Sequence, residues 1–143
     1  MSARRDPTFF TDRDLGNQFP NILTAARLRV ERHGDHFAPD CADVEWLSVV
    51  GAKGWIALTH NSRIRYTPNE LAAVMDHDVA LLVVVGHAPY ADLAQSFVAT
   101  IERIRTFLDT HRPPFIAKVY RASPSRVASA RVLPGRVELW HPR

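Results

Sequence analysis

The chain has 143 residues, 46% of them hydrophobic and 23% charged, which suits one globular domain and leaves too little chain for two. Its longest strongly apolar run, Val79 to Val85, is too short to cross a bilayer. Its single cysteine, Cys41, has no second thiol for a disulfide. We therefore expect a soluble cytoplasmic protein without membrane contacts. Residues 1–120 hold 13 Lys and Arg against 14 Asp and Glu, whereas residues 121–143 hold 5 Arg against Glu138 alone, a distribution typical either of a basic arm for an acidic partner or of a solvated edge.

The amino-terminal part predicts a strand, a helix and a loop. The apolar segment from Thr8 to Thr11 is expected to form a short strand. Apolar residues then recur at helical spacing from Leu15 to Val30. Because Pro20 is tolerated only in the first turn, this helix should begin at residue 17 or 18. Residues 33–41, which include a glycine and a proline, are predicted to form a loop.

The middle of the chain alternates between predicted helices and strands. In order, these are a helix over about 42–53, a strand over 55–58, a helix over 68–77 and a strand over 79–85. Asp40 or Asp43 is expected to cap the first of these helices, and Gly54 to stop it.

The last part predicts one long helix and three further strands. An amphipathic pattern from Leu93 to Leu108 indicates a helix that ends before two consecutive prolines. Residues 115–120 follow as a strand. Beyond them, the runs 127–132 and 137–140 flank the turn signal Leu133 to Arg136, which predicts a β-hairpin.

Short strands separated by helices indicate an α/β domain with a mostly parallel sheet, because parallel neighbours need crossover connections. Ligands of such sheets bind beyond the carboxyl ends of the strands. The polar residues in those positions are Asp12-Arg13-Asp14, Thr59-His60-Asn61-Ser62-Arg63 and Gly86-His87.

Carboxylates stand out among the residues that could carry chemistry. The sequence has no phosphate-binding Gly-rich loop, no HExxH, no paired CxxC and no GxSxG. The acids at predicted strand and helix ends are Asp12, Asp14, Asp35, Asp40, Asp43 and Glu45. Because crowded carboxylates repel each other unless a divalent cation lies between them, and because hard oxygen ligands prefer Mg²⁺ or Mn²⁺ to zinc, these acids predict a magnesium or manganese site.

Within this set, Asp12 is the first candidate for a metal ligand, and its alternative role is to cap the next helix. Asp14 could face the same pocket or cap that helix. Asp43 and Glu45 lie in the first turn of a helix, where the helix dipole favours acids in any case. A zinc site using His33 and His36 is a weaker alternative, because no third nitrogen or sulfur ligand follows at suitable spacing.

Four stretches of the sequence together carry a family resemblance. They are FFTDRDLG at 9–16, GDHFAPDCADVEWL at 34–47, GWIALTHNSRIR at 54–65 and RPPFIAKV at 112–119. In this order they resemble the PIN-like domain of the VapC toxin group, in its short branch. The resemblance covers roughly residues 7–120 and implies a three-layer α/β/α fold, so we expect a PIN-like domain over 1–120. From their charge and the hairpin signal, residues 121–143 are expected to form a basic extension packed on the same domain.

The resemblance also implies an activity and its residues. It implies a ribonuclease that depends on Mg²⁺ or Mn²⁺, that dimerises or assembles with an antitoxin, and that is inhibited by this small protein. The family's first acid falls on Asp12, and the acid of its second helix falls on Asp43, with Glu45 nearby. Its Thr-x-Asp falls on Thr59 to Asn61, so an amide stands where a carboxylate is usual.

The expected reaction is hydrolysis of an RNA phosphodiester bond. Asp12 and Asp43 would hold the ion, Asp14 or Glu45 would complete its shell through water, and Asn61 would offer a carbonyl oxygen. Thr59 would orient the water or a ligand through its hydroxyl. Arginines would contact the RNA backbone without reading its sequence, and the candidates are Arg13, Arg63 and Arg65.

Three hypotheses follow for the function. The first is an active or weakened ribonuclease toxin whose antitoxin covers the acidic pocket and places an arginine near Asp12. The second is a catalytically silent PIN-like module that binds RNA or a protein, which Asn61 favours. The third is a small hydrolase with an unrelated metal such as zinc, which would stay bound through purification.

Overall fold

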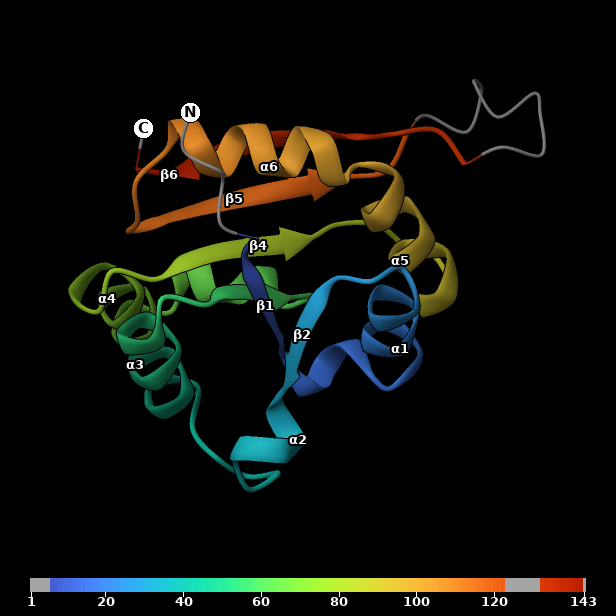
Figure 1. Ribbon diagram of the computed structural model, residues 1–143. Coiled ribbons are helices and arrows are strands. Elements are labelled where there is room, and N and C mark those ends of the chain that lie inside the picture. Colours follow the sequence, from blue (N-terminus) through green and yellow to red (C-terminus); the bar gives the residue numbers. More distant parts are fainter. Residues whose placement is uncertain (1–5, 123–131, 143) are drawn as a thin grey trace.

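A six-stranded sheet organises the residues that the computed structural model describes, which are 6–122 and 132–142. In spatial order its strands are β2 (Arg29–Arg32), β1 (Thr8–Thr11), β3 (Ile56–Thr59), β4 (Ala80–Val84), β5 (Phe115–Tyr120) and β6 (Arg136–His141). Neighbours from β2 to β5 run parallel, and β6 pairs antiparallel with β5. The carboxyl ends of β1, β3 and β4 therefore meet at one edge of the sheet (Figure 1).

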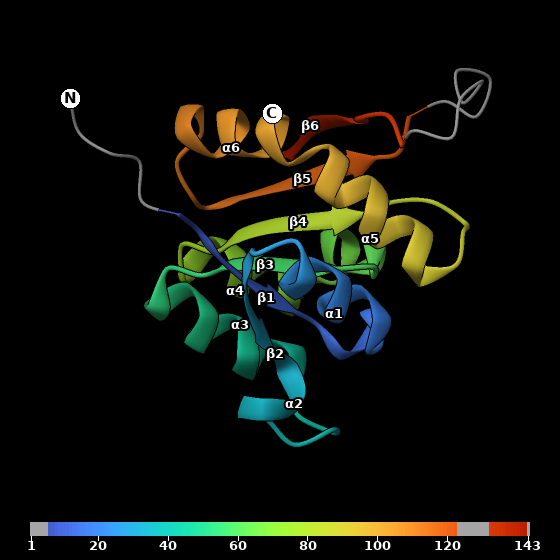
Figure 2. The same ribbon diagram turned by 45° about the vertical axis from the view of Figure 1, so that its right-hand side comes forward.

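Helices cover both faces of this sheet, as Figures 1 and 2 show from two directions. One face carries α1 (Gln18–Ala25), α5 (Tyr90–Ala99) and α6 (Ile101–Thr110), and the other carries α3 (Asp43–Lys53) and α4 (Pro68–Asp76). Three short helices lie in the connections: η1 (Arg13–Leu15), α2 (His33–His36) and η2 (Ser62–Tyr66). The arrangement is a three-layer α/β/α fold. Within the described residues, no helix is both long and apolar enough to cross a membrane.

Two hydrophobic cores follow from the alternation of side chains along the strands. In β1, Phe9 packs into the core under α1 and α5, whereas Phe10 packs into the core under α3 and α4. The central strand β4 is buried along its whole length, which explains its continuous apolar sequence. The expected α/β class with a mostly parallel sheet is therefore confirmed.

The structure corrects the first predicted helix. It ends at Ala25 and does not continue to Val30. Arg27 adopts a positive φ of 67°, and Leu28 N donates to Leu23 O over 3.1 Å, so the chain reverses direction there. The following residues form β2, an edge strand that the helical spacing of Val30 had concealed.

Other boundaries differ as well. The predicted loop over 33–41 begins with the short helix α2, and the cap of α3 is Ala42, so neither Asp40 nor Asp43 caps it. The long helix predicted over 93–108 is two helices, α5 and α6, that meet at the buried Thr100. The Thr100 hydroxyl donates to Ser96 O over 2.7 Å and accepts from a backbone N–H of the carboxyl-terminal segment, so the helix bends there.

The predicted carboxyl-terminal hairpin is described only in part. β6 begins at Arg136, the last residue of the predicted turn, and pairs with β5. Most of the run predicted as the other hairpin strand, 127–131, lies outside the described residues. Gly135 lies so close to Tyr120 O that a Cβ would collide with it, which explains a glycine before this strand. Residues 136–141 of the basic extension therefore belong to the main sheet.

Gly51 allows α3 to pack closely on the end of α4, because a Cβ there would collide with His77 O. Gly51→Ala should therefore lower the free energy of unfolding by about 1–3 kcal/mol, measured by urea denaturation. Gly34→Ala is the matched control, since nothing lies within 4 Å of its Cβ position. Equal unfolding curves for Gly51→Ala and the unchanged chain would contradict the close approach of α3 to α4.

Candidate functional site

Asp12 follows β1 directly and is 5% exposed. Its backbone N–H donates to Leu58 O over 2.9 Å, which continues the pairing of β1 with β3 by one residue. η1 then begins, so Asp14 lies beside Asp12 at the carboxyl end of the sheet. This is the edge where the strand-end rule places a ligand.

Thr59, the last residue of β3, joins the two carboxylates. Its Oγ1 lies 2.9 Å from Asp12 Oδ2 and 3.1 Å from Asp14 Oδ2. A hydroxyl has one proton to donate, so it satisfies only one of these two carboxylates at a time. His60 N donates to Asp14 at 3.2 Å from each carboxylate oxygen. The pair is thus held together by hydrogen bonds from the Thr59 hydroxyl and the His60 backbone.

Burial and mutual repulsion make charge costly at this pair. Burial raises the pKa of Asp12 to about 7, and the negative charge of Asp14 adds to the effect, while the Thr59 hydrogen bond acts in the opposite direction. Burial also raises the pKa of Asp14. Asp43 contributes to both raised pKa values, so its carboxylate lies within electrostatic reach of the pair.

Asp43 begins α3 and is oriented by a buried tryptophan. Trp46 Nε1 donates to Asp43 Oδ1 over 2.8 Å, and the Trp46 ring is fully buried against Phe10. Asp43 lines a cleft of about 380 Å³. The other residues that line this cleft are Asp12, Arg13, Asp14, Asn61 and Arg63. The structure thus brings the predicted acids of β1, η1 and α3 to one cleft.

Asn61 has a local structural role beside its place in the cleft. Its Oδ1 accepts from Arg63 N over 3.0 Å and so caps η2, and its own N–H donates to Thr59 Oγ1 over 3.1 Å. Asparagine is among the preferred residues for such a cap. The amide at this position therefore matches the local backbone, and an aspartate would accept the same hydrogen bond.

Two residues named from the sequence lie away from the cleft. Glu45 is exposed and accepts from Cys41 Sγ over 3.4 Å, and it is not among the cleft-lining residues. Arg65 Nε is buried without a hydrogen-bond partner, and its guanidinium lies 5.5 Å from the centre of the Tyr66 ring. Arg13 and Arg63 are exposed and line the cleft, where they can meet a polyanion.

The structure shows the roles of two further polar residues near the cleft. Glu70, in the first turn of α4, has a pKa raised by burial and then by the charge of Asp43, so it lies within electrostatic reach of Asp43. His60 Nδ1 bonds to Val84 O over 2.7 Å, which ties the loop after β3 to the end of β4. The strand-end rule selects the segment that contains His60, whereas Glu70 has no signal in the sequence beyond a favourable helix position.

The zinc hypothesis receives no support from the histidines. His33 is buried among aromatic rings, and its Nε2 has no hydrogen-bond partner. His36 Nε2 bonds instead to Glu31 Oε1 over 2.7 Å. Within residues 6–122 and 132–142, no three His, Cys, Asp or Glu side chains gather as a metal-ligand group, and this holds for the three acids of the cleft as well, so a cation there would be held by one or two carboxylates together with water.

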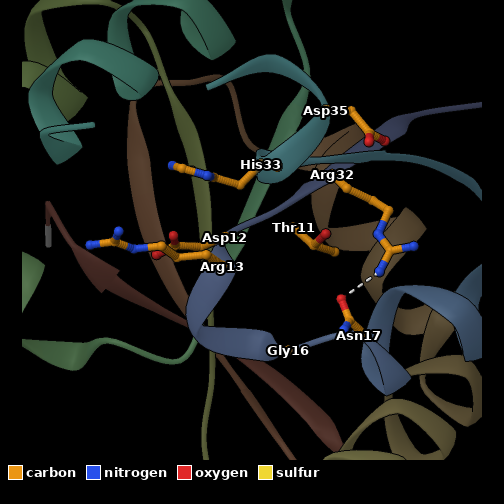
Figure 3. Close-up of a pocket in the computed structure, with 9 residues that line it drawn as sticks. Thr11, Asp12, Arg13, Gly16, Asn17, Arg32, His33 and Asp35 are labelled. Carbon is orange, nitrogen blue, oxygen red and sulfur yellow. Dashed lines mark hydrogen bonds between the residues drawn. The ribbon is translucent and has the colours of Figure 1, made fainter. Parts of the chain in front are cut away.

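A second cavity, of about 430 Å³, adjoins the acidic cleft (Figure 3). Asp12 and Arg13 line both cavities, so the two spaces share a wall. Its remaining lining comes from β1, α1, β2 and α2 and their connections, namely Thr11, Gly16, Asn17, Arg32, His33, Gly34 and Asp35.

The fold and the acidic cleft at the carboxyl ends of its parallel strands define an α/β domain with a carboxylate site. A comparison with known families identifies the class of this domain. The family model described as a PIN-like domain matches residues 7–86, more than half of the chain. The chain therefore belongs to the PIN-like domain family, whose members are commonly nucleases. The match contains every residue that lines the cleft. No curated protein and no solved structure matched the chain.

Proposed function

We propose that this PIN-like domain is a metal-dependent ribonuclease toxin of the VapC group, and that it belongs to a type II toxin–antitoxin system in the cytoplasm. One observation carries the proposal: the buried Asp12 and the half-buried Asp14 share a single hydroxyl. A third carboxylate, Asp43, lines the same cleft. This concentration of negative charge is unfavourable in the protein alone and is suited to a cation.

The donors in the cleft fit magnesium or manganese. Mg²⁺ is commonly held by one or two carboxylates together with water, and it does not need a complete protein cage. Asp12 and Asp14 would hold the ion, with Asp43 lining the same cleft and the Asn61 carbonyl as a neutral oxygen donor. When bound, Mg²⁺ or Mn²⁺ supplies a Lewis acid that acidifies water and neutralises charge on phosphate oxygens.

The chain's own residues prepare the site for a phosphodiester. Thr59 keeps Asp12 and Asp14 together, and Trp46 fixes the direction of the Asp43 carboxylate. Arg13 and Arg63, both exposed at the cleft, can bind the phosphates of RNA on either side of the bond that is cut. Because these contacts are to the backbone, they position RNA without selecting its sequence.

Asn61→Asp tests the proposal with a substitution that should strengthen metal binding. The new carboxylate adds negative charge to the cleft and keeps the cap of η2, so the Mg²⁺ or Mn²⁺ concentration for half-maximal RNA cleavage should fall on the order of tenfold. The measurement is cleavage of labelled RNA over a metal titration, with EDTA as the blank. Asn69→Asp, an exposed position of α4 outside the cleft, should leave the titration unchanged.

A second function, a silent PIN-like module that binds RNA or protein, is favoured by Asn61, which places a neutral amide where a carboxylate would add charge to the cleft. RNA binding without metal-dependent cleavage, in both the original chain and Asn61→Asp, would select this alternative. Cleavage by either protein that EDTA abolishes would select the nuclease.

For regulation, we propose that the antitoxin covers the acidic cleft and places an arginine beside Asp12, where its charge replaces that of the metal. A homodimer or a toxin–antitoxin hetero-oligomer is the expected assembly. Deleting residues 121–143 is not a clean test of a role for the basic extension, because it also removes β6 from the sheet. Reversing the charge of exposed residues in this segment, with β6 kept, tests the role of the basic extension without disturbing the sheet.

A further inference from the structure

The second cavity presents an arginine whose direction is fixed by neutral partners. Arg32 ends β2, and its Nη2 donates to Asn17 Oδ1 over 2.8 Å while its Nη1 donates to Asn21 Oδ1 over 3.2 Å. Figure 3 shows the Arg32 side chain reaching toward Asn17 at the rim of the cavity. Both partners are amides, so the guanidinium is oriented but its charge is not neutralised. Of its five N–H donors, those not used by the two amides remain available.

Among the residues that the structure describes, no acidic side chain pairs with Arg32. Asp35 lines the same cavity, yet within the described part of the chain neither Arg32 nor Arg13 forms an ion pair. The two arginines lie on opposite sides of the segment from Thr11 to Asp12 (Figure 3). An extended anion crossing the end of β1 would therefore meet one arginine on each side.

His33 forms part of the same wall but does not offer its nitrogen to an anion. The residue is 2% exposed, its ring packs against Phe10 and Phe37, and its Nε2 is buried, so this atom is not open to the cavity. An anion in the cavity would therefore meet the guanidinium groups of Arg32 and Arg13.

We infer that the cavity between β1, α1 and α2 is a subsite for the RNA backbone next to the bond that is cut, with Arg32 as its phosphate-binding residue and Asn17 and Asn21 as the residues that position it. The inference rests on the proposed nuclease function for the identity of the polymer. The shared wall at Asp12 and Arg13 makes the cavity continuous with the acidic cleft, so a strand bound at one reaches the other. Arg32 binds the phosphate and does not touch the reacting atoms.

Arg32→Gln should weaken RNA binding about fivefold to tenfold at low salt, and the slope of log K against log salt should decrease by about 0.7, the value for one phosphate contact with a single strand. The measurement is fluorescence anisotropy of a short labelled single-stranded RNA in EDTA, so that no cleavage occurs. Arg29→Gln is the matched control, because Arg29 is an exposed arginine at the other end of the same strand and lines neither cavity.

Two further variants separate binding from a structural role of Arg32. Arg32→Lys keeps the positive charge but loses the planar guanidinium group. It should therefore keep the slope of log K against log salt and recover part of the RNA affinity that Arg32→Gln loses. Asn17→Ala keeps the arginine but frees its direction, and it should weaken RNA binding without changing the slope. If Arg32→Gln and Arg29→Gln bind RNA equally with equal slopes, the subsite is wrong.

The subsite and the nuclease fail in different ways. Metal-dependent cleavage together with an Arg32→Gln variant that binds RNA like the original chain would overturn the subsite alone. Binding that depends on Arg32, without cleavage in Mg²⁺ or Mn²⁺, would overturn the nuclease and support the subsite. A chain that neither binds nor cleaves RNA would overturn both.

Discussion

Asp12→Asn is expected to reduce metal-dependent RNA cleavage at least about 100-fold. A catalytic cation contributes several kcal/mol to the stabilisation of the transition state, and 1.36 kcal/mol corresponds to a factor of ten in rate. Asparagine has nearly the same shape as aspartate, so it can keep the contact with Thr59 while removing the charge that holds the ion. The measurement is the initial rate of cleavage of labelled RNA at saturating Mg²⁺ or Mn²⁺.

Asp76→Asn is the matched control for this loss. Asp76 is an exposed acid at the end of α4 and does not line the cleft, so the same change of charge there should leave the cleavage rate within about twofold. RNA binding in EDTA should persist in Asp12→Asn, because Arg13 and Arg63 are unchanged. Undiminished cleavage by Asp12→Asn would remove the acidic cleft as the centre of the reaction.

The same substitution should stabilise the metal-free protein at high pH. The pKa of Asp12 rises from 3.8 to about 7 in the folded state, chiefly through burial and then through Asp14. A raised pKa means that the folded state binds this proton more tightly, so its contribution is present below pH 3.8 and is lost as the pH rises through about 7. The full cost of charging this buried group is roughly 4 kcal/mol.

Asp12→Asn removes that cost. In EDTA, the gain in unfolding free energy of the variant over the original chain should therefore grow by up to roughly 4 kcal/mol between about pH 4 and pH 8, measured by urea denaturation. Adding Mg²⁺ at the higher pH should raise the stability of the original chain and leave the variant unchanged. If the unfolding free energies of the two proteins had parallel pH dependences, the pKa of Asp12 would not be raised in the folded state. Asp76→Asn, the control, should give a curve parallel to that of the original chain.

Much of the fold could be predicted because buried parallel strands produce apolar runs. β1, β3, β4 and β5 were each found within one or two residues on this basis. β2 was not, because it is a half-exposed edge strand with the sequence RVER, and its one apolar residue, Val30, continued the helical spacing of α1. The break between α5 and α6 was also concealed, since Thr100 bends the helix through hydrogen bonds that leave the apolar spacing intact.

The site could be predicted in part. The strand-end rule selects Asp12, Asp14 and Thr59 from local sequence, the helix-end acids include Asp43, and the family resemblance supports Asp12 and Asp43 as the pair that holds the ion. Sequence spacing could not reveal that one hydroxyl joins two carboxylates, because this contact links residues 47 positions apart. Nor could it place Arg32 beside the acids, since the strand that carries Arg32 was itself assigned to a helix.

The charged sequence of β2 also bears on how copies of this protein behave at high concentration. An edge strand offers unpaired backbone N–H and C=O groups, which invite strands of other chains and lead to aggregation. β2 has only four residues, and three of them, Arg29, Glu31 and Arg32, are charged. If the β2 strands of two copies paired along their edges, like charges would be brought together and buried. The charges on β2 therefore disfavour intermolecular β-sheet formation at this edge. Neutralising those positions together should favour insoluble protein during expression, even where each single change is tolerated.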